Sequence, residues 1–215
     1  MAKINSIGNT TEYLTVDSIA ASDSYIQFDL IGVSAFRIGV DQTDDSFCLS
    51  LGNALGTNNR MTIDTTGNVR IPLQPAVLTY DTDAHANVSG DGTSYSIPAS
   101  AEIFDQGGDY SSPNFTAPAT GIYFFQGNSI LVTTPAGGGN YFYFALVTSN
   151  RTYYCSSLPT LNRVANFYGN GGLSITSHVM ADMDSADTAY FKIVSVGGAK
   201  TDDLQNEVMN YYLIG

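Results

Sequence analysis

Apolar and polar residues alternate along most of this chain with a period of two, which is the spacing of β-strands. Between residues 24 and 72 the alternating segments are short, and turn-forming pairs such as Asp44-Asp45, Gly52-Asn53 and Gly67-Asn68 follow them. The pattern predicts a small β meander or triangular prism over residues 24–75. A sheet of this size is marginal without partners, so we expect three copies around one axis to cover it.

A domain boundary is predicted where two prolines, Pro72 and Pro75, make a stiff and extended connector. Residues 1–23 alternate only weakly, and we expect an extended arm or attachment segment there. From Ala76 onward about ten strand-like segments follow, with a loop from Asp81 to Asp91 after the first of them. No helix longer than one turn is needed, so the fold class is all-β with a head at residues 76–215.

The segment Asn140–Val147 reads NYFYFALV, and the period of two divides its side chains between two faces. Phe142, Phe144 and Leu146 form a purely apolar set, which we assign to the interior of a sandwich. Tyr141 and Tyr143 lie on the other face, which is too apolar for water but suits a protein interface.

The run Phe115–Phe125, FTAPATGIYFF, ends in three consecutive aromatic residues and suits a strand with apolar partners on both faces. We predict that Tyr123 or Phe125 packs between subunits together with Tyr141 and Tyr143, so that Tyr143→Asp releases monomers. The alternative is that all four side chains belong to the core of a monomeric sandwich.

The charge balance excludes two classes of partner. The chain carries 20 acidic and 8 basic residues and a formal net charge of −12, with an excess of acids on both sides of the predicted boundary. Nucleic acids and anionic membranes are therefore not expected as partners. No signal-peptide pattern opens the sequence, and no apolar run approaches the ~20 residues that span a bilayer, so we expect synthesis in a cytoplasm without membrane insertion.

Residues for catalysis or metal binding are few. The chain has two histidines, His85 and His178, and its two cysteines, Cys48 and Cys155, form no C-x-x-C pair. This set argues against a zinc site, and the sequence contains no phosphate-binding loop and no G-x-S-x-G motif. We therefore predict that the protein is not an enzyme.

One acidic cluster leaves calcium as the only cofactor to consider. Asp182, Asp184 and Asp187 fall between two predicted strands, and carboxylate oxygens are ligands that Ca²⁺ prefers. A solvated turn is the plainer interpretation, and a glycosidase carboxylate pair is a third. The looser group of Asp81, Asp83 and Asp91 has the same interpretations.

Aromatic residues in polar segments are candidates for recognition of a partner. Tyr153, Tyr154, Phe167 and Tyr168 lie among Asn, Ser and Gly residues, a composition typical of adaptable binding surfaces. The competing interpretation is that they fill the core at the ends of the sheets.

The head also resembles a known family through four features in order. These are the Ile103-Phe104-Asp105 strand, a Gly- and Tyr-containing loop, the F-T-x-P-x-x-G-x-Y-x-F pattern at residues 115–125, and the terminal Tyr212-Leu-Ile-Gly215. This order resembles the globular heads of complement subcomponent q and tumour necrosis factor. The resemblance implies a ten-stranded jelly roll that assembles as a homotrimer and binds partners without chemistry.

A second resemblance covers Asn59–Pro72, which reads NRMTIDTTGNVRIP. It is similar to the repeated unit of phage tail-fibre shafts and related trimeric surface proteins. Pro72 stands where that unit usually continues with a glycine.

The two resemblances together imply a trimeric fibre or spike protein on a phage or virion surface. Its N-terminal segment would attach to the virion, and its head would bind a host-surface glycan or protein. A structural decoration protein of the capsid is the alternative, and a capsule-degrading enzyme is a third hypothesis.

Overall fold

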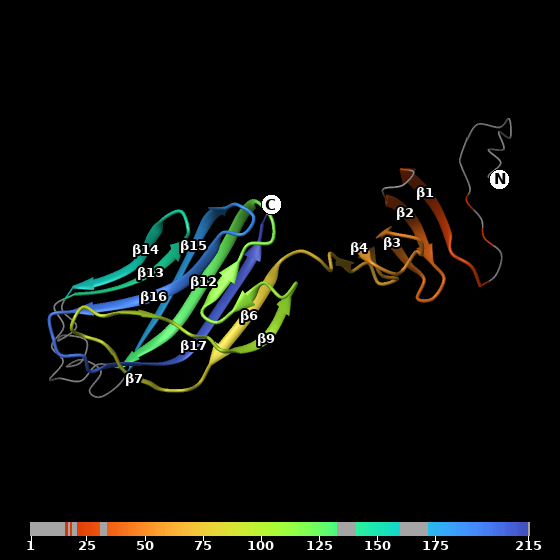
Figure 1. The fold of residues 1–215 in the computed structure, drawn as a ribbon. Coiled ribbons are helices and arrows are strands. Elements are labelled where there is room, and N and C mark those ends of the chain that lie inside the picture. Colours follow the sequence, from red (N-terminus) through yellow and green to blue (C-terminus); the bar gives the residue numbers. More distant parts are fainter. Residues whose placement is uncertain are drawn as a thin grey trace, which may run out of the picture. The chain divides into compact units, whose positions relative to one another are not determined.

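The computed structural model describes residues 16, 18, 21–30, 34–132, 141–159 and 172–214 as strands, turns and loops (Figure 1). The all-β prediction is confirmed. The chain divides into two compact units, Met1–Leu73 and Gln74–Gly215. Most of the predicted arm at residues 1–23 lies outside the described residues. A search of the described residues finds no helix that is long and apolar enough to cross a membrane.

The first unit contains a single antiparallel sheet in which each strand pairs with the next, so the predicted meander is confirmed. Its strands are β1 Ser24–Leu30, β2 Ser34–Asp41, β3 Ser46–Leu51, β4 Asn59–Ile63 and β5 Val69–Arg70. Gly67, with a φ of 89°, turns the chain between β4 and β5. Hydrogen bonds from Thr66 and Asn68 fix the Asp64 carboxylate in this turn and hold its pKa well below the usual range.

The second unit is a sandwich of two six-stranded antiparallel sheets. One sheet has the order β10-β11-β16-β13-β14, with β8 also paired to β16, and the other has the order β15-β12-β17-β6-β9, with β7 also paired to β17. The bounds are β6 Ala76–Asp81, β7 His85–Ser89, β8 Ser94–Ser96, β9 Ala101–Gln106, β10 Tyr110–Ser111, β11 Asn114–Thr116, β12 Gly121–Val132, β13 Tyr141–Thr148, β14 Thr152–Pro159, β15 Leu173–Met183, β16 Thr188–Val196 and β17 Asp202–Leu213.

The connections make this sandwich a jelly roll of the predicted type. Strands that follow one another in the chain, such as β14 and β15, β15 and β16, or β16 and β17, lie in opposite sheets. The described part of the head holds twelve strands, because β7 and β10 pair in addition to the expected ones. Strand β7 occupies part of the segment Asp81–Asp91, which the sequence pattern had indicated as a loop.

Aromatic rings fill the space between the sheets. The Tyr211 ring from β17 stacks on Phe115 from β11 at a centroid distance of 5.4 Å, and Phe144 stacks on Phe191 at 5.1 Å. The buried Tyr123 hydroxyl donates a hydrogen bond to the Ala119 carbonyl at 2.7 Å, so its polar group is satisfied inside the core. The predicted interior set of Phe142, Phe144 and Leu146 is confirmed, because all three side chains are fully buried.

The prediction that Tyr123 or Phe125 packs between subunits is wrong. Tyr123 and Phe125 are fully buried in their own sandwich, where both rings contact Phe115 at 5.4 and 5.9 Å. A side chain that has no exposed surface in one subunit cannot contact another subunit. The strand is apolar on both sides, as expected, but Ile122 and Phe124 are the residues that point outward.

One buried acid in the head forms no ion pair with any described residue. The Asp202 side chain at the start of β17 is 1% exposed, and its Oδ2 atom accepts no hydrogen bond. Burial raises the pKa of this carboxyl above its ordinary value of 3.8. The ionised form is therefore less favourable in the folded state than in the unfolded state.

We predict that Phe125→Ala lowers the free energy of unfolding by about 3–5 kcal/mol, because it leaves a cavity in a closely packed core. The matched control is Phe104→Ala, since Phe104 is 49% exposed on β9. Denaturant unfolding followed by tyrosine fluorescence measures both changes. Equal losses for the two variants would contradict the assignment of Phe125 to the core.

We predict that Asp202→Asn stabilises the protein at pH 7 relative to the wild type, and that the gain shrinks as the pH falls. A carboxyl whose pKa is raised in the folded state makes the folded protein less stable as the pH rises from about 3.9 through that raised pKa. An amide does not titrate, so the variant does not have this loss. Unfolding midpoints between pH 3.5 and 8 check this, with Glu102→Gln on exposed β9 as the control for one lost charge. A gain that is the same at every pH would show that ionisation of Asp202 is not the cause.

Candidate functional site

The sheet of the first unit presents an apolar face that its own unit leaves partly or largely exposed. Directly paired residues share a face, and the register pairs Phe28 with Phe36, Ile38 with Leu49, and Phe47 with Ile63. We call this surface the Phe28 face. Its members are Ile26, Phe28, Phe36, Ile38, Val40, Phe47, Leu49, Met61 and Ile63.

The exposure of the Phe28 face is large for side chains of this kind. The Phe28 side chain is 62% exposed, Phe36 is 42% and Val40 is 42%. The small interior of this unit lies on the opposite face, where Cys48 and Leu55 are buried. A contiguous apolar surface of this extent indicates an interaction site.

The head has a second exposed apolar surface on the outer side of the sheet β15-β12-β17-β6-β9. The register places Phe124 of β12 between Met180 of β15 and Tyr212 of β17, and the Phe124 and Tyr212 rings lie 5.1 Å apart. Ile122 lies further along β12 on the same side. The exposed fractions of Met180, Tyr212 and Ile122 are 63, 43 and 41%. We call these four residues the Phe124 face.

Along the same strands the Phe124 face gives way to amide side chains. Asn210 donates a hydrogen bond from Nδ2 to Oε1 of Gln126 at 3.2 Å, and Asn128 donates from Nδ2 to the Thr176 hydroxyl at 2.6 Å. The Asn210 Oδ1 atom is buried and accepts no hydrogen bond. This part of the surface therefore combines apolar contact area with polar groups that fix orientation, which is the composition of protein interfaces.

Three tyrosines gather on the outer side of the other sheet. The Tyr143 ring lies 5.4 Å from Tyr141 and 5.2 Å from Tyr154, measured between centroids. The exposed fractions of Tyr141 and Tyr154 are 42 and 67%, while Tyr143 between them is half-buried. We call Tyr141, Tyr143 and Tyr154 the tyrosine trio. It joins two residues predicted for a subunit interface with one predicted for receptor binding.

Tyr153 and Tyr154 are neighbours in the chain but lie on opposite faces of β14. The Tyr153 side chain packs against the hydrophobic core, and its hydroxyl donates a hydrogen bond to Oδ1 of Asp182 at 3.1 Å. Burial raises the pKa of the Tyr153 hydroxyl. Tyr153 thus connects β14 to β15, and Tyr154 is the member of this pair that is available to a partner. Phe167 and Tyr168 lie outside the described residues.

The acidic turn is the predicted calcium candidate, and its carboxylates contact different partners. Asp182 forms an ion pair with Arg151 at 3.0 Å, and Asp187 accepts hydrogen bonds from Asn150 and from the backbone N–H of Asp184. Among the described residues, these three acids do not bring one oxygen each within 4.8 Å of one another. Calcium binding at this turn stays a prediction.

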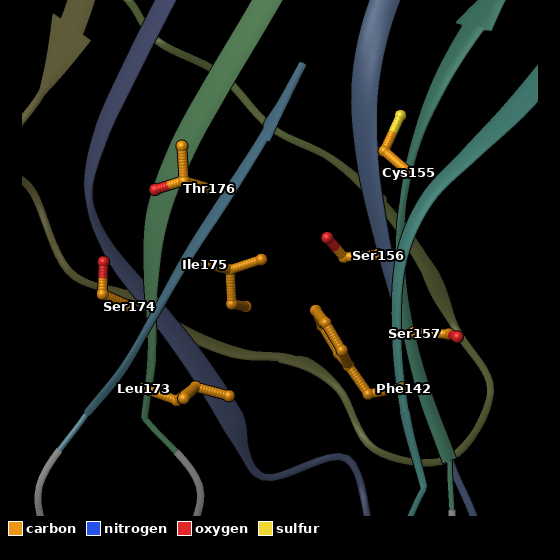
Figure 2. A pocket seen from close by; sticks show the side chains of 8 residues that line it. All are labelled: Phe142, Cys155, Ser156, Ser157, Leu173, Ser174, Ile175 and Thr176. Carbon is orange, nitrogen blue, oxygen red and sulfur yellow. The ribbon is translucent and has the colours of Figure 1, made fainter. Parts of the chain in front are cut away.

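A pocket of about 470 Å³ opens between the edge strands β14 and β15 of the two sheets. Figure 2 shows the Phe142 and Ile175 side chains pointing toward each other across it, with Ser156 beside them. The lining includes Cys155, whose thiol pKa is raised by burial. The rest of the described lining is Ser and Thr hydroxyls and apolar side chains, with no carboxylate or histidine that could act as a general acid or base.

No family model matches the chain, and no curated protein matches it. Solved structures similar to it include the globular domain of zebrafish complement 1qA protein, at 14% identity and a TM-score of 0.44, over 66% of this chain and 98% of that chain. Murine APRIL at pH 8.5 is similar at 10% identity and a TM-score of 0.42, over 65% and 99% of the two chains. The PRD1 vertex protein P5 is similar at 12% identity and a TM-score of 0.40, over 66% and 99%. The jelly-roll assignment rests on the strand order described above.

Proposed function

We propose that this chain is the protomer of a non-enzymatic, homotrimeric fibre or spike protein on a virion surface, whose head binds a glycan or protein of the host cell. The observation that carries the proposal is the Phe28 face, a row of aromatic and aliphatic side chains that a single chain leaves in contact with water.

Assembly of several chains removes the contact between the Phe28 face and water. A closed ring of identical subunits covers the same apolar surface on every copy, and the hydrophobic effect contributes roughly 25 cal/mol for each Å² that is buried. A trimer is favoured over a dimer because β4, the Gly67 turn and β5 belong to Asn59–Pro72, the segment that resembles the repeated unit of trimeric fibre shafts.

In the head, we assign the subunit contact to the Phe124 face. Like the sequence-based prediction for Tyr123 and Phe125, this assignment follows from a strand that is apolar on both sides. It differs in that the contact is made by Ile122 and Phe124, which point outward. The amides of Gln126 and Asn210 beside it supply hydrogen-bonding groups at the edge of an apolar patch. The role of Tyr141 and Tyr143 between subunits stays a prediction.

The tyrosine trio is the surface that we assign to the receptor. Tyrosine offers a large and rigid contact area at a low cost in side-chain entropy, and its hydroxyl can hydrogen-bond to a sugar or a peptide. Mutual packing of the three rings restricts their rotation before a partner arrives. Tyr154 is the most exposed of them and the centre of this assignment.

One further observation favours binding over catalysis, and a second narrows the class of partner. The pocket between β14 and β15 has no acid–base pair in its described lining, and the net charge of −12 disfavours nucleic acid and anionic membranes. We also propose that the N-terminal segment, residues 1–23, attaches the protein to the virion.

We predict that the wild-type protein has three times the 22.9 kDa mass of one chain in solution, and that Phe28→Asp and Phe124→Asp each shift it toward monomer. A carboxylate buried in an apolar interface loses its hydration without gaining a partner. Light scattering coupled to size exclusion at micromolar concentration measures the masses.

The matched control is Tyr154→Asp, which adds the same charge to an exposed aromatic site outside both faces and leaves the trimer intact. A wild-type protein that elutes as a single subunit would overturn the trimer. Release of monomers by Tyr143→Asp, but not by Phe124→Asp, would move the subunit contact of the head to the tyrosine trio.

We predict that Tyr154→Ala reduces binding of labelled trimer to intact host cells by about tenfold or more, because exposed aromatic anchors dominate many interfaces. Flow cytometry measures the binding. Tyr153→Phe is the control: it removes the hydroxyl that bonds to Asp182 and leaves the trio in place, so binding persists.

Undiminished binding by Tyr154→Ala would show that the receptor contacts another surface. If the wild-type protein binds emptied capsids but no host cells, the protein is a capsid decoration, which is the structural alternative.

A further inference from the structure

Three potential metal ligands meet inside the head, away from the exposed faces described above. Asp81 ends β6, His85 begins β7, and Glu207 lies in β17. In the antiparallel register Glu207 is directly opposite Asp81, and His85 is paired with Leu204, three positions from Glu207. Strand β17 therefore brings Glu207 to Asp81 and His85, which both precede it by more than 120 residues in the sequence.

The pairing of Asp81 with Glu207 sets two carboxylates against each other in the interior. The Asp81 side chain is 6% exposed and Glu207 is fully buried. Like charges directly opposite each other on a sheet repel, and buried charges are stable when they are paired or coordinate a metal. In the described residues near them, no Lys or Arg forms an ion pair with either carboxylate. Apart from the imidazole of His85, whose Nε2 lies 3.6 Å from Asp81 Oδ2, no basic side chain of the described residues is paired with these two acids.

Two of the atoms that face this space make no hydrogen bond to any described residue. Within the part of the chain that the structure describes, His85 Nε2 and Glu207 Oε2 are buried and make no hydrogen bond. Asp81, by contrast, is held in place, because its Oδ1 accepts the backbone N–H of Asp83 at 2.9 Å and its Oδ2 accepts the Ser100 hydroxyl at 2.8 Å. Such outer hydrogen bonds orient the carboxylate that faces a metal.

The spacing fits a shared ion. One ligand atom from each of the three side chains lies within 4.8 Å of the others, and His85 Nε2 is 3.6 Å from Asp81 Oδ2. That separation is long for a hydrogen bond. It is close to the ~3.4 Å between two ligands of one tetrahedral ion with bonds of about 2.0–2.1 Å.

Against the expectation from sequence that the protein has no zinc site, we propose that Asp81, His85 and Glu207 bind one divalent transition-metal ion, with Zn²⁺ as the representative case. A set of one imidazole nitrogen and two carboxylate oxygens suits Zn²⁺, whereas Ca²⁺ takes six to eight oxygen ligands and does not require an imidazole. The ion ties β7 to β17 and to the end of β6, and water completes its coordination. Its role is to hold this end of the sandwich together.

A proton is the competing occupant of this space. Burial raises the pKa of Glu207, and a neutral carboxylic acid would also relieve the repulsion from Asp81. The two cases differ in their response to metal, because a protonated pair gains nothing from added Zn²⁺.

The test uses the full chain, stripped with a chelator and titrated with Zn²⁺ at pH 7.5. Calorimetry is expected to give one ion per chain, with a rise in Tm of about 5 °C when free Zn²⁺ reaches 100 times Kd. Replacement by Co²⁺ is expected to give intense visible absorption bands, which report a tetrahedral site. Both signals are expected to disappear in His85→Gln, whose side chain is only partly buried and whose loss does not remove core packing.

The matched control is His178→Gln, which removes the other histidine, on the outward side of β15, and leaves binding unchanged. Glu207→Gln is the second variant, and it is expected to weaken Zn²⁺ binding at least tenfold while preserving the fold at neutral pH. Wild-type protein that shows no stoichiometric Zn²⁺ binding overturns the proposal. So does binding that survives His85→Gln or disappears in His178→Gln.

Discussion

The aromatic layer between the two sheets of the head is the constraint on which the other features depend. Phe115, Tyr123, Phe125 and Tyr211 fill the interior with interlocking rings, and each comes from a strand whose side chains alternate between two faces. Once Tyr123 and Phe125 point inward, the residue between them must point outward. The exposed aromatic surface of the head is therefore a geometric consequence of how its core is filled.

The first unit depends on the same alternation but uses it differently. Its polar face is covered by a turn of its own chain, where Leu55 is buried, while its apolar face is left open. This is the reverse of the usual arrangement for a small sheet, in which the apolar side faces the only available interior. The sheet becomes an ordinary half-buried layer only when another surface covers the Phe28 face.

Much of the architecture was predictable because it depends on local signals. Turn residues such as Gly67 and the alternation within each strand give the meander and the strands of the head. The inward or outward phase of β12 is ambiguous within Tyr123-Phe-Phe125, which is apolar at every position, and the sequence signal for it lies further on, where Gln126 and Asn128 share the face of Phe124. In the fold, that phase is fixed by Phe115, which shortly precedes β12 in the chain, and by Tyr211 of the distant strand β17, both of which pack on one side of β12.

The grouping of polar and aromatic residues depended on pairing between distant strands. Asp81 and His85 are four residues apart, a visible signal, but their partner Glu207 is set by the register of β17. In the same way, Tyr154 joins Tyr143 because of an irregularity in the β13–β14 register next to Cys155. A sequence pattern contains the candidate residues, and only the register decides which of them meet.

The alternation along β14 limits how this protein can vary. Tyr153 faces the interior and Tyr154 faces outward, so the insertion or deletion of one residue in this strand would exchange their places and expose the inner side of the strand. Apart from a bulge such as the one at Cys155, point substitutions at outward positions of β14 are therefore the simplest route to a new binding preference. Changes of length are confined to the turns that connect the strands, where an added residue leaves the phase of each strand intact.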